Sequence, residues 1–241
     1  AVLVFLIGHI LVMGIPNLRP ELFAWEYNSE NVSLTPALIN TVLMTAFALL
    51  IATPPGIFAA IWLVEYARRG SKLVKVVRVT TETLQGIPSI VYGFFGLMVL
   101  VPIMQSLFGG GGKGILTASI LLGIMILPTI IGVSESAINA VPSSYYEGSL
   151  ALGASHERSV FFATLPAAKS GIMAAVVLGV GRAIGETMAV MMVAGNQARV
   201  PSSIFKGVRT LTANIVMEMG YATDLHREAL IATAVPRNCL P

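Results

Sequence analysis

The sequence predicts an all-α protein that crosses a membrane several times, with its helices packed as a bundle. Of the 241 residues, 55% are hydrophobic and only 11% are charged. Soluble globular domains carry charge on about 25% of their residues because their surface faces water. Apolar runs near the roughly 20 residues that a membrane-spanning helix needs recur along the chain. Most of its surface is therefore expected to face lipid or other helices.

Apolar stretches give the predicted order of membrane helices. Residues 1–36 are predicted to be the remnant of a first membrane helix and an external loop, since no signal-peptide features accompany the apolar start. A short apolar stretch from Glu228 stops too soon to span, and residues 236–241 form an atypical tail. We predict one transmembrane domain at residues 37–235, with about six helices in all and the last one truncated. Its four runs of spanning length are 37–64, 87–108, 115–134 and 171–194.

Three prolines fall inside these runs. Pro54, Pro102 and Pro128 each lack the N–H that a helix interior uses. A membrane bundle tolerates them because neighbouring groups satisfy the freed carbonyls. We expect ordinary helix bends at these positions.

Basic residues between the second and third helices set the predicted orientation. The preceding loop carries Arg19 alone beside three glutamates, so the basic loop is expected to face the cytoplasm. Alternation then places residues 145–171 in the cytoplasm and residues 196–227 outside, although the outer loop also carries four basic residues. The basic residues of the cytoplasmic loop are Arg68, Arg69, Lys72, Lys75 and Arg78.

Residues 71–85 carry apolar side chains at helical spacing with basic residues between them. This pattern fits an amphipathic helix that lies at the cytoplasmic membrane interface. A solvated connector placed by its charge fits equally well.

Several classes of function are excluded by composition and spacing. The chain has 15 Lys and Arg against 12 Asp and Glu, so it offers no broad basic face for nucleic acid. Cys239 is its single cysteine, and its three histidines are far apart, which leaves no metal site and no internal disulfide. The stretch GGGGKG at 109–114 is not a phosphate-binding P-loop, because Leu107 and Gly114 stand where glycine and Ser or Thr are required. We expect no cofactor and no catalysis on this chain, so an ATP-driven process would need a separate ATPase.

Arg182 and Glu186 are the residues that cost most to place in a membrane. They fall near the middle of the run 171–194, where insertion of a charge costs about 2.5 to 3.5 kcal/mol. On one helix they would lie about 40° apart, so they could pair with each other or face one cavity. An ion pair that locks helix to helix is one interpretation. The other is a charged element of a solute path, since arginine suits bidentate contact with an oxyanion.

Residues 145–171 alternate charged, small and apolar residues between two long apolar runs. Gly153 can end a helix that contains Glu147, and Ser155 can cap a second short helix. Pro166 then starts or bends the next helix. We predict a short cytoplasmic helix that offers three apolar side chains to the groove of a partner: Val160, Phe161 and Phe162.

At these residues the sequence resembles the membrane subunits of ABC importers. Their coupling loop reads EAA, three residues, G, nine residues, I, one residue, LP. Glu147, Gly153, Leu165 and Pro166 keep that spacing without a gap, while Gly148, Ser149 and Ala163 depart from it. The stretches GIPSIVYGFFG, GRAIGETMAVMMVAGN and RTLTANIVMEMGYA are similar to the phosphate importer branch of the family, closest to its C-type permease subunit.

The resemblance implies a type I importer fold in the bacterial cytoplasmic membrane, with several partners. These are an A-type sister permease that forms a heterodimer with this chain, a dimer of ATP-binding subunits, and an external phosphate-binding protein that delivers phosphate. Residues 147–166, including Ser155 and Phe161, would contact the ATPase. Arg182 and Glu186 would belong to the transport path, and Ser89 and Asn40 are weaker candidates for its polar lining. A capping or helix-packing role suits these last two at least as well.

Two alternatives stay open at this point. A permease for sulfate or molybdate would share the coupling loop, and a secondary transporter or channel would need no ATPase.

Overall fold

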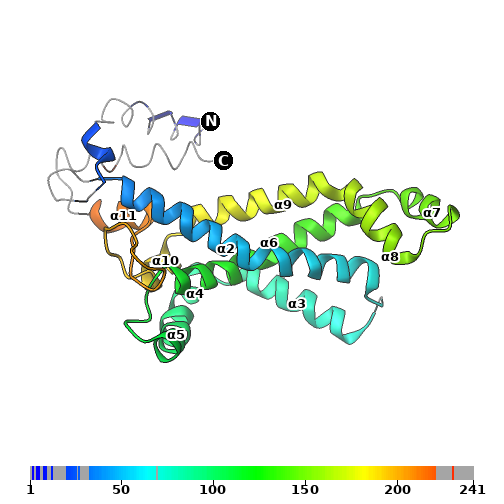
Figure 1. The fold of residues 1–241 in the computed structure, drawn as a ribbon, viewed down its shortest axis with the longest axis horizontal. Coiled ribbons are helices and arrows are strands. Elements are labelled where there is room, and N and C mark those ends of the chain that lie inside the picture. The colour runs from blue at the N-terminus through cyan, green and yellow to red at the C-terminus, as the bar shows by residue number, and fades with distance from the viewer. Residues whose placement is uncertain are drawn as a thin grey trace. The chain divides into compact units, whose positions relative to one another are not determined.

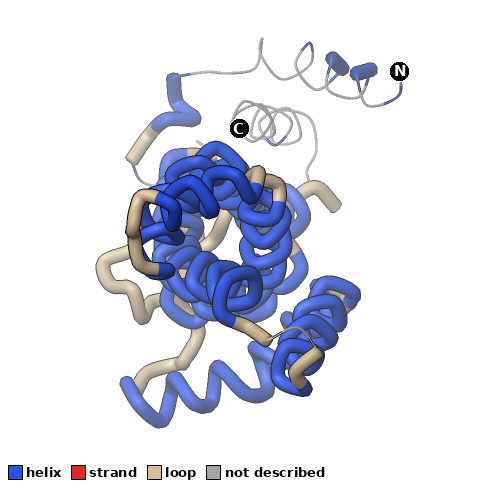
Figure 2. The backbone as a smooth tube through the Cα atoms, turned by 90° about the vertical axis from the view of Figure 1, so that its right-hand side faces the viewer, coloured by secondary structure: helices blue, strands red, loops and turns tan. Residues whose placement is uncertain are grey.

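The part of the chain that the computed structural model describes is helical. In Figure 2 the described segments are helices and loops, and no strand is assigned among them, which confirms the all-α prediction. The predicted first helix at residues 1–16 and the final apolar stretch at 228–235 lie mostly outside the described residues, and the tail at 236–241 lies wholly outside them. The structure describes residues 20–25, 33–68 and 70–220. It also describes eight single residues: Val2, Val4, Phe5, Gly8, His9, Val12, Tyr27 and Leu230.

Within these residues, four helical stretches are long and apolar enough to cross a membrane. They are Thr35–Tyr66, Ser89–Phe108, Ile115–Asn139 and His156–Gly185. The first three confirm the predicted runs to within a few residues. The fourth differs from the prediction at both ends.

Prolines are accommodated inside these helices. α2 (Thr35–Ile61) contains Pro54 and Pro55, and a π-helical turn, η3 (Trp62–Tyr66), extends it. α6 (Ile115–Asn139) contains Pro128. The span between them consists of α4 (Ser89–Phe95), a second π turn η4 (Gly96–Leu100) and α5 (Val101–Phe108), with Pro102 at the start of α5.

The fourth span begins fifteen residues before the predicted position and ends nine before its predicted end. α8 (His156–Ser159), the π turn η5 (Val160–Thr164) and α9 (Leu165–Gly185) form one helical stretch. Pro166 follows η5 at the same offset at which Pro102 follows η4. The wider π turn before each proline lets the helix continue past the missing N–H. The predicted short helix is therefore the first turn of a long one.

This span ends because Glu186 starts a new helix. Its Oε1 accepts hydrogen bonds from the N–H groups of Thr187 (3.1 Å) and Ala189 (3.2 Å), which belong to the beginning of α10 (Met188–Val193). A carboxylate at a helix N-terminus is stabilised by the unpaired N–H groups there. The predicted run 171–194 is thus wrong: it is two helices separated at Gly185.

The predicted amphipathic segment is confirmed as a helix, α3 (Lys72–Gly86), and the Ser71 side chain caps it by accepting from the Val74 N–H at 3.3 Å. Its apolar residues Leu73, Val76 and Val79 are exposed. The helix is tied to α6 by an ion pair between Arg78 and Glu135, and by a hydrogen bond from Gln85 Nε2 to the Pro128 carbonyl at 3.2 Å. Its place at the membrane interface stays a prediction.

The chain divides into two compact units, each described here by itself. In the unit made of residues 49–87 and 123–182, a core forms from Ala60, Ile61, Ile138, Val160 and Ala168.

In the other unit, made of residues 1–48, 88–122 and 183–241, α10 packs closely against α4. A Cβ added at Gly93 would lie 2.6 Å from Met192 Sδ and 3.1 Å from Ala189 Cα. Glycine at position 93 therefore permits the close packing.

Large apolar side chains remain exposed along the spans. Leu50, Phe58 and Met98 are 70%, 63% and 74% exposed. So many large apolar side chains exposed along spanning helices fit contact with lipid or with other subunits.

Candidate functional site

The turn after α7 (Ser143–Ala151) has the form that the sequence predicts. Gly153 adopts φ +84°, in the left-handed region that favours glycine. The Gly153 N–H donates to the Leu150 carbonyl at 2.9 Å, and the Ala154 N–H donates to the Ser149 carbonyl at 3.2 Å. This pair of bonds is the Schellman motif that closes many helices. Gly153 therefore fixes the place where α7 stops. Figure 1 shows α7 and α8 next to each other, joined by this turn.

Ser155 then begins α8, as predicted. Its side chain accepts a hydrogen bond from the Arg158 N–H at 3.4 Å, and Glu157 lies in the first turn. An acid at that position suits the positive end of the helix.

Two side-chain pairs hold α8 against α7. The Tyr146 hydroxyl is 2.8 Å from His156 Nδ1, and the Ser159 hydroxyl donates to the Ser149 hydroxyl at 3.0 Å. Ser149 stands where the resembled motif has alanine, so this departure gains a hydrogen bond between the two helices. Each pair joins residues ten positions apart, so the turn is held by its own side chains.

The outer surface of this turn is apolar and exposed. Leu152 and Phe162 are 91% and 79% exposed, and Phe161 is about half exposed. The prediction that Val160 faces a partner is wrong, because Val160 is fully buried in the core of its unit. Leu165 packs against the same core. The turn therefore presents Leu152, Phe161 and Phe162, and Val160 anchors it.

A cavity of about 570 Å³ lies at the turn. The cavity is lined by Ser149, Leu152, Gly153, Ala154, Ser155 and Arg158. Glu147 on α7 and Pro166 on α9 are exposed and do not line it.

Arg182 lies in the last turn of α9 and is partly buried. Its Nη1 donates a hydrogen bond to Thr129 Oγ1 on α6 at 3.1 Å. Because α9 ends at Gly185, Glu186 does not lie on the same helix, and the expected i, i+4 relation between the two charges does not hold. Glu186 instead caps α10, and its carbonyl accepts from the Thr212 hydroxyl at 3.0 Å.

Asn40 and Ser89 belong to the same unit as Glu186, whereas Arg182 belongs to the other. Asn40 is fully buried on α2, and its Nδ2 donates to the carbonyls of Arg199 and Arg209 at 3.0 Å each. Ser89 is the partly buried first residue of α4. In the described part of this unit, no hydrogen bond joins any two of Asn40, Ser89 and Glu186.

A buried ion pair that sequence reasoning missed lies between Arg209 and Glu218, which ends α11 (Leu211–Glu218). Arg209 Nη1 also donates to Asn214 Oδ1 at 3.0 Å, and the Tyr27 hydroxyl donates to Glu218 at 3.2 Å. Burial, and then the Glu218 carboxylate, raise the pKa of Tyr27. The only sequence signal was a base and an acid on either side of a Thr-capped helix within a segment expected to be an external loop.

Comparison with known proteins connects this geometry to a family. The profile of the binding-protein-dependent transport system inner membrane component matches residues 52–232. The chain is 44% identical to the probable ABC transporter permease protein YqgH of Bacillus subtilis, over 78% of this chain and 60% of that protein. It is 36% identical to the phosphate transport system permease protein PstC of Mesorhizobium japonicum, over 87% of this chain and 70% of that protein. The PstC of Haemophilus influenzae is 33% identical, over 86% and 71%. The chain thus spans about 60 to 70% of the length of these relatives.

Solved structures share the fold. A chain of the inward-facing MetNI methionine ABC transporter superposes with a TM-score of 0.69 at 19% identity, over 89% of this chain and 94% of that one. A chain of an amino acid ABC transporter gives 0.58 at 20% identity, over 83% of each. These likenesses confirm the predicted type I importer permease fold. The chain is a multi-pass membrane protein that belongs to the family of binding-protein-dependent transport system inner membrane components.

Proposed function

We propose that this chain is the transmembrane permease subunit of an ATP-driven phosphate importer in the bacterial cytoplasmic membrane. The observation that carries the proposal is the glycine-closed turn between α7 and α8, in which Gly153 stands at its place in the coupling motif and Leu152 and Phe162 are exposed. The substrate class is supported by the relatives named as phosphate transport permeases. Sulfate and molybdate remain the oxyanions against which it must be tested.

The proposed partners follow from this role. A dimer of ATP-binding subunits would receive the exposed turn, a phosphate-binding protein would deliver substrate on the outside, and a sister permease would complete the membrane path. Gly181 and Gly185 are exposed, and a Cβ at either would meet no atom within 4 Å. Small residues spaced four apart let another helix approach closely. ATP hydrolysis is assigned to the separate subunit.

The continuous helix from α8 to α9 supplies a mechanical route. His156 begins this helical stretch and Arg182 lies in its last turn, about 39 Å further along the helix at 1.5 Å per residue. A displacement of the turn by the ATPase would move this helix as a body and shift Arg182 relative to Thr129 on α6, to which it is hydrogen-bonded. Arg182 could then exchange its threonine partner for an oxyanion, which binds arginine more strongly.

Uptake into vesicles tests the function. The complete complex is reconstituted with its binding protein, ATP is supplied on the cytoplasmic side, and uptake of labelled phosphate is measured with competing sulfate or molybdate. We expect ATP-dependent phosphate uptake that neither competitor suppresses. Preferential uptake of sulfate or molybdate would refute the substrate assignment, and uptake without ATP would refute the importer class.

Replacing Arg182 tests the proposed path. Arg182→Gln is expected to abolish phosphate uptake while the complex still assembles, because the glutamine keeps a polar side chain at this partly buried position but carries no charge for the anion. Arg78→Gln is the matched control, since Arg78 is half exposed and pairs with Glu135, six residues after Thr129 on α6. Loss of assembly in Arg182→Gln would show that the arginine is structural.

A further inference from the structure

A basic cavity lies in the unit that contains α4, α5 and α10. It measures about 520 Å³ and is formed by the glycine-rich loop after α5 together with the segment after α10. Among the described residues that line it, three are cationic, namely Lys113, Arg199 and Lys206, and none is acidic. Such a concentration of one sign of charge in a recess raises the local concentration of anions.

Backbone contacts hold the two loops together. The Leu116 N–H donates to the Ile204 carbonyl at 3.0 Å, and the Val208 N–H donates to the Ala194 carbonyl at 2.8 Å. Gly195 and Gly207 are so close that a Cβ on Gly195 would lie 2.8 Å from Gly207 Cα. The cavity is therefore shaped by fixed backbone before any ligand arrives.

Side chains add to this fixation. The ring centroids of Phe108 and Phe205, one from each side of the cavity, lie 4.9 Å apart. Buried Asn40 holds the Arg199 carbonyl from α2, and Arg199 Nε donates to the Gly207 carbonyl at 3.3 Å. The Lys206 ammonium donates to Ser202 Oγ at 2.9 Å. Neither cation is neutralised by these neutral acceptors.

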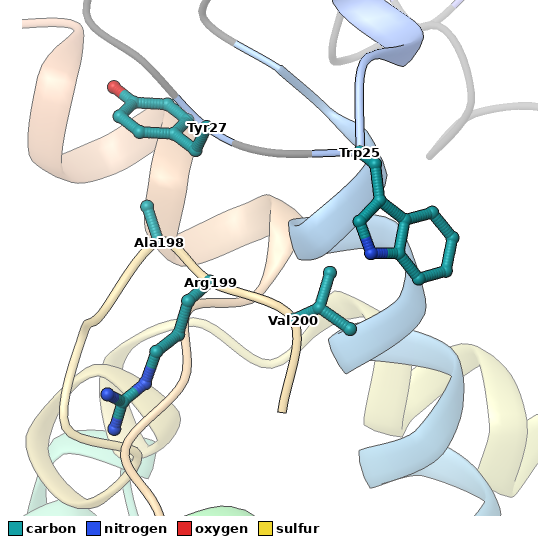
Figure 3. A pocket seen from close by; sticks show the side chains of 5 residues that line it. All are labelled: Trp25, Tyr27, Ala198, Arg199 and Val200. Carbon is teal, nitrogen blue, oxygen red and sulfur yellow. The ribbon is translucent and has the colours of Figure 1, made fainter. Parts of the chain in front are cut away.

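Arg199 also borders a second cavity, of about 390 Å³, with Trp25 and Tyr27. In Figure 3 its guanidinium extends away from both aromatic rings. The charge of Arg199 is thus not directed at the aromatic cavity.

We propose that the cavity formed by Lys113, Arg199 and Lys206 binds inorganic phosphate. The inference rests on the proposed function for its ligand and for its place on the outer side of the membrane. The loop that carries Lys113 joins the spans Ser89–Phe108 and Ile115–Asn139, and the predicted orientation puts that loop outside. Phosphate held there would wait at the outer surface of the permease, separate from Arg182. Multivalent oxyanions suit three cations in a rigid recess.

Equilibrium binding of radiolabelled inorganic phosphate tests this site. The complete complex is kept in a phosphate-free detergent without its binding protein, so that neither lipid headgroups nor the delivery protein contribute. We expect saturable binding, weakened about tenfold by Lys113→Gln and by Lys206→Gln, because each removes one charge-assisted contact. Lys75→Gln is the matched control, an exposed lysine on α3 outside the cavity, and should bind phosphate as the unmodified complex does.

Four results would overturn the inference. They are no phosphate binding by the unmodified complex, equal binding by Lys113→Gln and Lys206→Gln, competition by added phosphatidylglycerol, or weakened association with the binding protein while phosphate affinity is unchanged. The last two would assign the cavity to a lipid headgroup or to acidic side chains of the partner. If the complex transports phosphate but shows no lysine-dependent binding, the phosphate site in the cavity is refuted and the proposed function stands. If the complex binds phosphate through the lysines but does not transport it, the proposed function is refuted and the site stands.

Discussion

The turn between α7 and α8 and the segment at residues 195–218 are held in opposite ways. The turn is closed by Gly153 and by side-chain bonds between residues ten positions apart. The segment is held by bonds to residues 159 to 191 positions away, through Asn40 and Tyr27. A turn whose hydrogen bonds are local can keep its shape when the helices that carry it move, whereas a segment bonded to distant residues cannot move without breaking those bonds. The first suits a moving contact with an ATPase and the second suits a fixed outer surface.

The strongest test of the fixed segment is its buried ion pair. Arg209→Met would leave Glu218 buried without its cation, which costs about 3 to 5 kcal/mol of unfolding free energy. In the purified complex in detergent, we expect this subunit to unfold at a clearly lower midpoint than in the unmodified complex. Arg78→Met removes the half-exposed ion pair with Glu135 and should cost at most about 1 kcal/mol. Equal effects of the two changes would show that the buried pair does not hold the segment.

The next effect comes from the amide that joins the segment to α2. Asn40→Leu keeps the number and branching of the side-chain heavy atoms but leaves the carbonyls of Arg199 and Arg209 without this donor, which should cost about 1 to 3 kcal/mol. Asn139→Leu changes an exposed amide at the end of α6 and should alter the midpoint little. Phosphate uptake should fall together with stability in Asn40→Leu. Reduced uptake at unchanged stability would instead assign Asn40 to the transport path.

The smallest change in stability is expected at the turn between α7 and α8, where a substitution should mainly weaken association with the ATPase. Gly153→Ala places a Cβ at φ +84° and should cost about 1 to 2 kcal/mol locally, although no atom lies in its way. Because the strain would also change the geometry of the turn, the ATPase should bind it less tightly. We expect co-purification of the ATPase to fall about tenfold, which corresponds to about 1.4 kcal/mol.

Gly148→Ala is the matched control for this turn. It lies inside α7 with open space around it, restores the alanine of the coupling motif, and should gain about 0.5 to 1 kcal/mol. ATPase association should be kept or improved. Unchanged association in Gly153→Ala would count against the coupling role of the turn.

Local chemistry explains why much of this could be predicted. Gly153 and Ser155 act on their own neighbours through backbone angle and a side-chain cap, so their effect does not depend on the rest of the chain. The length and apolar composition of each run likewise predict a membrane-spanning helix without reference to the rest of the chain. The fold class, three of the four described spans and the exposed turn followed from residues read in order.

The fourth span shows where sequential reading fails. The run from α9 into α10 stays mainly apolar apart from Arg182 and Glu186, and the hydrogen bond from the Ala189 N–H to the Glu186 carboxylate marks the break between the two helices. Val160 resembles Phe161 and Phe162 in the sequence, but the core around Ala60 and Ile138 takes Val160 inside and leaves the two aromatics exposed.

The sequence by itself determined that the chain is a helical membrane protein with a glycine-closed, serine-capped turn, because hydrophobic length and backbone preference are local properties. Tertiary structure alone decided that Arg209 pairs with Glu218, that Asn40 holds two distant carbonyls, and that Lys113, Arg199 and Lys206 line one cavity. Asn40 and Lys113 lie far along the chain from their partners, and Arg209 stands outside the helix that Glu218 ends. Pairing at such distances depends on how the segments pack, and no periodicity in the sequence encodes it.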